Sequence, residues 1–185
     1  MPRISRARCA ACGTRRGLAE PPPIDPVGIL EVLVRHEVQF VLIGGVAANV
    51  HGYPLPTQDV DITPAPDRAN YVRLAAALRE MNARIRVERE PEGVPFLIDG
   101  ATLAGNVTWT LTTDAGNLDV VTEPAGTSGF RDIQRDAVDV ELGPNLTVQV
   151  ASLVDIIRSK EAAGRAKDLA ALPALRATLE RQERR

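Results

Sequence analysis

The spacing of hydrophobic residues changes once along the chain. Up to residue 81 it alternates between helical and short apolar segments, which predicts helices over 27–38, 45–52 and 67–81 and strands over 39–43 and 59–63. Apolar residues then recur at every second position, which predicts strands over 84–89, 94–98, 106–113, 116–123, 137–143 and 146–151. Helical spacing returns over 152–164 and 167–182. This order predicts an α+β fold, a mixed α/β sheet flanked by helices.

Prolines separate a basic tail from the rest of the chain. The stretch "EPPPIDP" is stiff, so we expect a tail and linker over residues 1–25 and a single domain over 26–185. The tail contains Cys9 and Cys12 in a lone C-x-x-C. A structural zinc site needs four ligands, so we interpret this pair as part of the tail rather than as a metal or redox site.

Charge and composition exclude some classes of function. The net charge is −2, but setting aside residues 1–16 and 176–185 leaves 13 basic against 22 acidic residues. Charge alone therefore does not predict nucleic-acid binding, and 3% aromatic residues argue against a base-stacking platform. No apolar run reaches the roughly 20 residues of a membrane span, and no signal-peptide core follows the basic start. We expect a cytoplasmic protein.

Two aspartates lie one residue apart in the strand predicted over 59–63. Side chains two apart in a strand point to the same face, so Asp59 and Asp61 would lie side by side while Val60 and Ile62 face the core. Like charges so close resist burial, and Mg²⁺ offsets them because it prefers carboxylate oxygens. The alternative is an edge strand with two hydrated aspartates.

A third carboxylate, Asp119, is embedded in the apolar strand "GNLDVV". Three carboxylates on two neighbouring strands can hold two metal ions about 4 Å apart, one gripping a triphosphate and one lowering the pKa of an attacking hydroxyl. Asp114, Asp139 and Glu141 are alternatives for the third position.

Gly44 and Gly45 end one strand and begin a helix. Backbone amides at such a place can approach a phosphate closely, because no Cβ intervenes. A tight strand-to-helix turn is the alternative. The segment matches neither G-x-G-x-x-G nor G-K-[ST], so neither a Rossmann nor a P-loop site is predicted.

Lys160 continues the apolar face of the helix predicted over 152–164. A lysine there must either reach the edge of the core or meet an anion. Because Arg165, Lys167 and Asp168 follow, the segment predicts a cluster able to bind a phosphate or a counter-carboxylate. The charged run 84–90, in contrast, is interpreted as a solvated strand face.

The segments "GGVAANVHG…TQDVDI", "LDVV" and "SLVDIIRSKEAAGRAKDL" resemble a minimal nucleotidyltransferase of the DNA polymerase β superfamily. The similarity runs over about residues 29 to 175 and is greatest to MenT/AbiEii-type toxins of bacterial toxin–antitoxin systems. It implies C-terminal helices beside the site and an NTP substrate. The resemblance implies that Gly44 and Gly45 cradle the NTP and that Lys160 contacts its triphosphate. It implies that Mg²⁺ is bound by Asp59, Asp61 and Asp119. It also implies that Lys167 and Asp168 support the wall of the site.

Such toxins add nucleotides, often pyrimidine ones, to the 3′ end of tRNA and so block translation. A cognate antitoxin neutralises them, in some systems by phosphorylating the residue two before the first aspartate, which is Thr57 here. Relatives often carry an arginine in this segment, where the present chain has Leu55 and Pro56. Two alternatives stay open. The acceptor is a small molecule, such as an aminoglycoside, or a protein hydroxyl; or, as the missing arginine favours, the chain is a weakly catalytic nucleotide-binding regulatory module.

Overall fold

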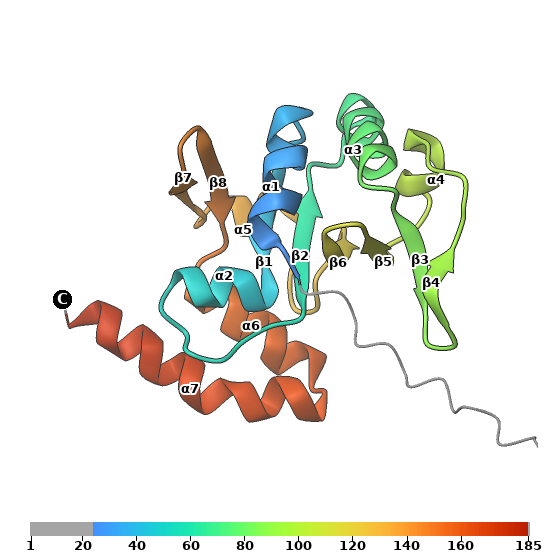
Figure 1. Ribbon diagram of the computed structural model, residues 1–185. Helices are drawn as coiled ribbons and strands as arrows, with labels where there is room; N and C mark the ends of the chain where they lie inside the picture. The colour runs from blue at the N-terminus through green and yellow to red at the C-terminus, as the bar shows by residue number, and fades with distance from the viewer. Residues whose placement is uncertain (1–23, 185) are drawn as a thin grey trace, which may run out of the picture.

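A computed structural model describes residues 24–184, so the tail with Cys9 and Cys12 lies outside the described residues. The strands within this range form one sheet in the order β4-β3-β5-β6-β2-β1-β8-β7 (Figure 1). Their bounds are β1 Phe40–Ile43, β2 Asp59–Pro64, β3 Arg84–Val87, β4 Glu90–Val94, β5 Thr108–Thr113, β6 Gly116–Val121, β7 Val138–Gly143 and β8 Leu146–Val150. The β2–β6 and β1–β8 pairs are parallel and the others antiparallel, which confirms the predicted mixed sheet.

Helices cover this sheet in two groups. Their bounds are α1 Pro26–Arg35, α2 Gly44–Val50, α3 Arg68–Glu80, α4 Gly100–Ala104, α5 Phe130–Gln134, α6 Leu153–Ala163 and α7 Ala166–Glu183. Helices α1 and α3 contact each other over the sheet, whereas α2, α6 and α7 gather at the end where β1 finishes and β2 begins (Figure 1). No helix of residues 24–184 combines the length and apolar character that a membrane span requires.

Aliphatic side chains build the core, as the low aromatic content requires. Leu30 and Leu33 of α1 are fully buried, and so are Val60 and Ile62 of β2. Burying one such side chain stabilises the fold by about 1.5–3 kcal/mol. The alternation in β2 therefore turns its odd-numbered residues, Asp59 and Asp61 among them, to the opposite face.

The predicted helix starts are confirmed by their caps. Asp67 accepts a hydrogen bond from the amide of Asn70 at 2.8 Å and begins α3. Ser152 accepts one from the amide of Asp155 at 3.1 Å and begins α6. Such caps satisfy amides of the first turn that have no partner within the helix. Helix α6 then ends at Gly164, whose left-handed backbone (φ +61°) suits a residue without a Cβ.

The strand predicted over 94–98 is wrong. Strand β4 ends at Val94, because Pro95 has no amide to extend the ladder. The apolar character of the following segment serves packing instead, since the ring of Phe96 stacks on Trp109 with centroids 5.0 Å apart. Helices α4 and α5 were not predicted, because five residues are too few to show a helical period.

Candidate functional site

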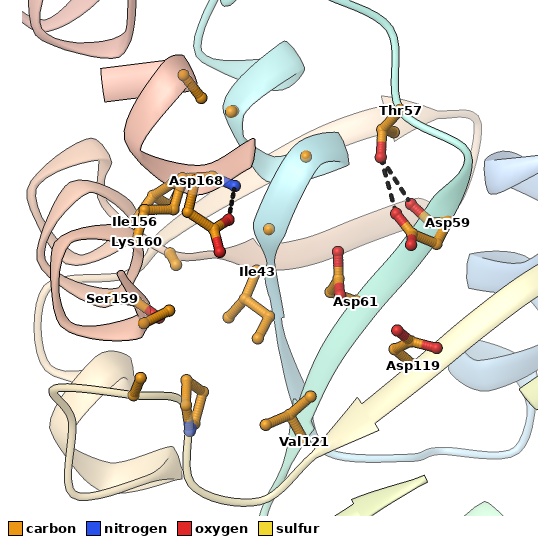
Figure 2. Close-up of a pocket in the computed structure, with 18 of the residues that line it drawn as sticks. Ile43, Thr57, Asp59, Asp61, Asp119, Val121, Ile156, Ser159, Lys160 and Asp168 are labelled. Carbon is orange, nitrogen blue, oxygen red and sulfur yellow. Dashed lines mark hydrogen bonds and ion pairs between the residues drawn. The ribbon is translucent and has the colours of Figure 1, made fainter. Parts of the chain in front are cut away.

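Three carboxylates meet on one face of the β2–β6 pair. The parallel register sets Asp61 directly beside Asp119, and Asp59 beside Asn117. Val60 and Leu118 point to the opposite, core face. Asp59, Asp61 and Asp119 line a cavity of about 600 Å³ between the sheet, α2, α6 and α7 (Figure 2). The structure thus brings the three predicted aspartates together.

The alternatives for the third carboxylate lie elsewhere. Asp114 belongs to the turn between β5 and β6 and accepts a hydrogen bond from Asn82 at 2.5 Å. Asp139 and Glu141 are exposed on β7, the edge strand at the far end of the sheet.

The pKa of Asp61 lies well above its ordinary value. Its pKa is raised to about 7, chiefly by burial and also by the charges of Asp59 and Asp119, although the Lys160 ammonium and the Gly45 amide act to lower it. Metal-free Asp61 is therefore partly protonated at neutral pH, which is the behaviour of a carboxyl group surrounded by like charges.

Gly44 and Gly45 leave room for side chains of the site. A Cβ on Gly44 would lie 2.1 Å from Oδ2 of Asp61, and the φ of Gly44 is +66°. A Cβ on Gly45 would lie 2.5 Å from Oγ1 of Thr57. Only glycine fits where α2 begins, because Asp61 and Thr57 occupy that space. Whether these glycines also cradle a triphosphate stays a prediction.

Thr57 lies at the rim of the cavity and contacts the first aspartate. Its hydroxyl donates to Oδ1 of Asp59 at 2.9 Å (Figure 2). Thr57 also lines the cavity, together with Leu55 and Pro56 of the segment that lacks the expected arginine.

A basic wall formed by α6 and α7 faces the aspartates. Asp168 is 1% exposed, and its carboxylate accepts hydrogen bonds from Lys160 Nζ at 3.0 Å and Arg165 Nε at 2.5 Å. Burial acts to raise the pKa of Asp168, but the hydrogen bonds from Arg165 and Lys160 outweigh it and lower this pKa. Asp168 thus holds Lys160 at the cavity, where Lys167 also lies.

Comparisons with known proteins now bear on this arrangement. No family model matches the chain, and no curated protein matches it. Solved structures do. The lincosamide antibiotic adenylyltransferase LnuA aligns with 84% of this chain and 99% of its own, at a TM-score of 0.56 and 15% identity. ANT(2")-Ia in complex with adenylyl-2"-tobramycin aligns with 84% of this chain and 87% of its own, at 0.53 and 15%. A nucleotidyltransferase candidate from Thermotoga maritima aligns with 80% of this chain and 87% of its own, at 0.51 and 15%.

The chain has the nucleotidyltransferase fold. At these identities the likeness concerns the arrangement of the elements, and the roles of individual residues rest on the geometry of this chain.

The interpretation of the run 84–90 as a solvated face is wrong for one residue of this nucleotidyltransferase fold, Arg86. Arg86 on β3 donates from Nη2 to Asp119, at 3.0 Å to Oδ1 and 3.3 Å to Oδ2. Burial raises the pKa of Asp119, against the opposite effect of the Arg86 charge. The alternation of Ile85 and Val87 could have shown that Arg86 leaves the core, but not which strand its side chain reaches.

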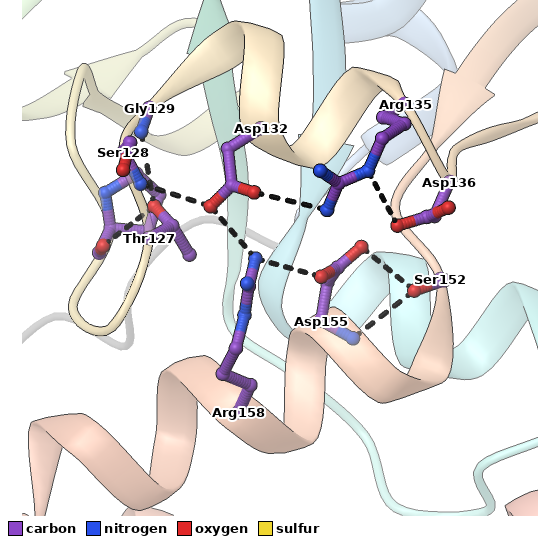
Figure 3. Close-up of polar contacts among 10 residues, drawn as sticks. Thr127, Ser128, Gly129, Asp132, Arg135, Asp136, Ser152, Asp155 and Arg158 are labelled. Atoms are coloured by element: carbon purple, nitrogen blue, oxygen red, sulfur yellow. Dashed lines mark hydrogen bonds and ion pairs between the residues drawn. The ribbon is translucent and has the colours of Figure 1, made fainter.

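The sequence also did not predict an ion-pair network that adjoins the cavity (Figure 3). Arg158 of α6 contacts Asp132 of α5 at 3.0 Å and Asp155 at 2.8 Å, and Asp132 accepts a hydrogen bond from the Ser128 amide at 3.0 Å. The network ties residues 122–129, which supply cavity-lining side chains, to α6. Sequence reasoning did not find it because α5 itself was not predicted.

The carboxylate side chains of the cavity are of the chemical type that binds a divalent cation. Three carboxylates on one face, one of them with a pKa raised to about 7, match the oxygen ligands that Mg²⁺ prefers. Within residues 24–184, however, no three His, Cys, Asp or Glu side chains are already positioned to hold an ion. The outer two carboxylates are instead held by their neighbours, Asp59 by Thr57 and Asp119 by Arg86.

Proposed function

We propose that the protein is a Mg²⁺-dependent nucleotidyltransferase that transfers a nucleotidyl group from an NTP to a hydroxyl acceptor. The observation that carries this proposal is the pairing of Asp61 with Asp119 beside Asp59, opposite the Lys160 ammonium, in a single cavity. Carboxylates on one wall and cations on the other suit a triphosphate that binds together with metal ions.

In the proposed reaction, an oxygen of the acceptor attacks the α-phosphorus in line. The new bond joins that oxygen to phosphorus, the hydroxyl proton is released to solvent, the bond to the β-phosphate oxygen breaks, and pyrophosphate leaves. When bound, the metal would neutralise developing charge and lower the pKa of the attacking hydroxyl. Asp59, Asp61 and Asp119 would be its ligands, with Asp119 on the side of the hydroxyl. Lys160 and Lys167 would balance the charge of the triphosphate.

For the acceptor, we favour the 3′ end of tRNA, with a pyrimidine NTP as donor and a block of translation as the result. The support is the similarity of the "KEAAGRAKD" segment to the toxin branch of the superfamily. A cognate antitoxin would then be the protein partner.

Thr57 would be the point of control by that antitoxin. Its hydroxyl lies 2.9 Å from Asp59, so a phosphoryl group there would add about two negative charges beside the metal ligands. Thr57→Glu should therefore abolish transfer, whereas Thr57→Ser should retain it. Equal activity of the two variants would exclude this role.

A small-molecule acceptor is the second candidate. The solved structures of LnuA and ANT(2")-Ia hold lincomycin and adenylyl-tobramycin, and the likeness to LnuA spans 99% of that protein. The cavity of about 600 Å³ is also within the size range of small-molecule sites.

One experiment separates these candidates. The purified chain is incubated with Mg²⁺, each α-labelled NTP in turn, and either total RNA, tobramycin or lincomycin. We expect label at the 3′ end of tRNA, and label in the drug would favour the second candidate. Asp59→Asn and Asp61→Asn should lose transfer, and Asp114→Asn, the same change outside the cavity, should keep it. NTP binding without transfer to any acceptor would leave a regulatory module as the better description.

A further inference from the structure

The Arg86 side chain spans an intervening strand to reach Asp119. Arg86 follows Ile85, which is paired with Leu111 of β5, while Thr110 of β5 is paired with Asp119 of β6. The guanidinium therefore extends over β5, on the face that carries the three aspartates. The β3–β4 ladder is irregular between Ile85 and Val87, so Arg86 lies at the irregularity. Such irregularities often redirect a side chain next to a functional site.

This ion pair differs from an ordinary surface pair. The side chain of Arg86 is 30% exposed and that of Asp119 18%, so water screens the two charges only in part. One guanidinium nitrogen lies within 3.3 Å of both carboxylate oxygens of Asp119. Asp61, the neighbour of Asp119 across the ladder, has no ion-pair partner within 4 Å among residues 24–184. Arg86 thus engages one particular member of the carboxylate set.

We propose that Arg86 occupies the metal-binding face of Asp119 and must be displaced when a divalent cation binds, so that Arg86 sets the metal affinity of the site. This inference rests on the proposed function. The physical reason is competition, because Mg²⁺ needs carboxylate oxygens at about 2.0–2.1 Å and a guanidinium on the same oxygens repels it. Arg86 is in this sense a positioning residue, which holds Asp119 in place while no cation is bound.

Binding of Mn²⁺, measured by electron paramagnetic resonance on the full chain, tests the inference without reference to activity. The variant is Arg86→Gln and the matched control is Arg84→Gln. Arg84 lies two positions earlier on the same strand, is exposed, and has no ion pair among the described residues. Both changes remove one positive charge from β3, so their difference isolates the contact with Asp119.

We expect Arg86→Gln to bind Mn²⁺ at least about tenfold more tightly than Arg84→Gln, since a contacting opposite charge changes the proton affinity of a carboxylate by roughly one to three pKa units. Equal or weaker binding by Arg86→Gln would overturn the inference. In the Asp119→Asn background, Arg86→Gln should no longer bind Mn²⁺ more tightly than Arg84→Gln, because the carboxylate that Arg86 contacts is gone.

Arg86→Lys keeps the experiment decisive if Arg86→Gln does not fold. A lysine keeps the charge but lacks the planar donor geometry, so Arg86→Lys is expected to bind Mn²⁺ more tightly than the wild type, and wild-type affinity would count against the inference. The two proposals also fail differently. Intact nucleotidyl transfer with equal Mn²⁺ affinities would overturn only the role of Arg86, whereas absence of Mn²⁺ binding and of transfer in all variants would overturn both.

Discussion

Asp61 and Asp119 are direct neighbours across the parallel β2–β6 ladder, and both line the same cavity. Two carboxylates in this relation destabilise each other unless a proton or a cation lies between them. Because burial and the other two aspartates raise the pKa of Asp61 to about 7, the metal-free protein takes up a proton where the metal-bound protein would hold an ion.

The first prediction concerns pH and stability without metal. The pKa of Asp61 is about 7 in the folded protein against 3.8 for the free group, so between these values the folded state binds more protons than the unfolded state. This contribution to stability is therefore lost as pH rises through about 7. Relative to wild type, Asp61→Asn should become more stable towards pH 8, by roughly 1–4 kcal/mol. Urea unfolding in EDTA at pH 5 to 8 measures it.

Asp114→Asn is the control for this experiment, because Asp114 lies in the β5–β6 turn, away from the cavity. It should show the same pH dependence as the wild type. If Asp61→Asn also follows the wild-type curve, the carboxylates are not coupled as described. Mn²⁺ affinity of the wild type should correspondingly fall as pH drops below about 7, since protons and metal compete for Asp61.

The second prediction concerns the start of α2. Gly44→Ala would place a Cβ 2.1 Å from Asp61 at a backbone φ of +66°, and both strain and clash act against folding. We expect a loss of about 1–3 kcal/mol and a loss of Mn²⁺ binding, because Asp61 must move. Gly143→Ala is the control, since a Cβ there meets no described atom within 4 Å. Thermal unfolding of the two variants should differ clearly, and equal stability would contradict the close approach of Asp61.

The third prediction concerns Asp168. Burial opposes ionisation of this carboxyl, but Arg165 and Lys160 lower its pKa below the usual value. Its contribution to stability is present above about pH 4 and is lost as pH falls below that value. Asp168→Asn should remove this acid-labile contribution of about 1–3 kcal/mol. It should also raise the KM for NTP more than it lowers kcat, because Lys160 loses its anchor.

Asp139→Asn, a change of the same kind on the exposed edge strand β7, should leave the pH dependence of stability and the KM for NTP unchanged. Urea unfolding at pH 3 and pH 6, together with steady-state kinetics, provides the comparison. An Asp168→Asn variant with wild-type KM would show that Lys160 keeps its position without this contact.

The fourth prediction concerns the network in Figure 3. Arg158→Ala removes an ion-pair partner that Asp132 and Asp155 share; their side chains are 17% and 7% exposed. Removing the ion-pair partner of the buried Asp155 carboxylate should cost about 1–3 kcal/mol. Arg135 also contacts Asp132 but is 66% exposed, so Arg135→Ala should cost less than about 1 kcal/mol. Chemical denaturation of the two variants checks the difference, and similar losses would contradict the central role of Arg158.

The aspartate set was predictable because each part has a local signal. Asp59 and Asp61 interrupt an apolar strand at a spacing that fixes their common face, and Asp119 interrupts another. Which strands become neighbours is not a local property. The contact of Arg86 with Asp119 depends on β3 lying beside β5 rather than beside β2, and the run around Arg86 looks like any hydrated strand. For the same reason Asp132 and Arg158, on helices α5 and α6, could not be paired from the sequence.

Strand β3 lies near the rim of the sheet and contributes little to the buried core. Its hairpin can therefore accept substitutions that would unfold the protein if they were made in β2 or β6. Substitutions at Arg86 in natural variants would then change the affinity of the site for divalent cations while the reacting groups stay unchanged. Selection on ion availability and selection on chemistry would then act on separate parts of the same molecule.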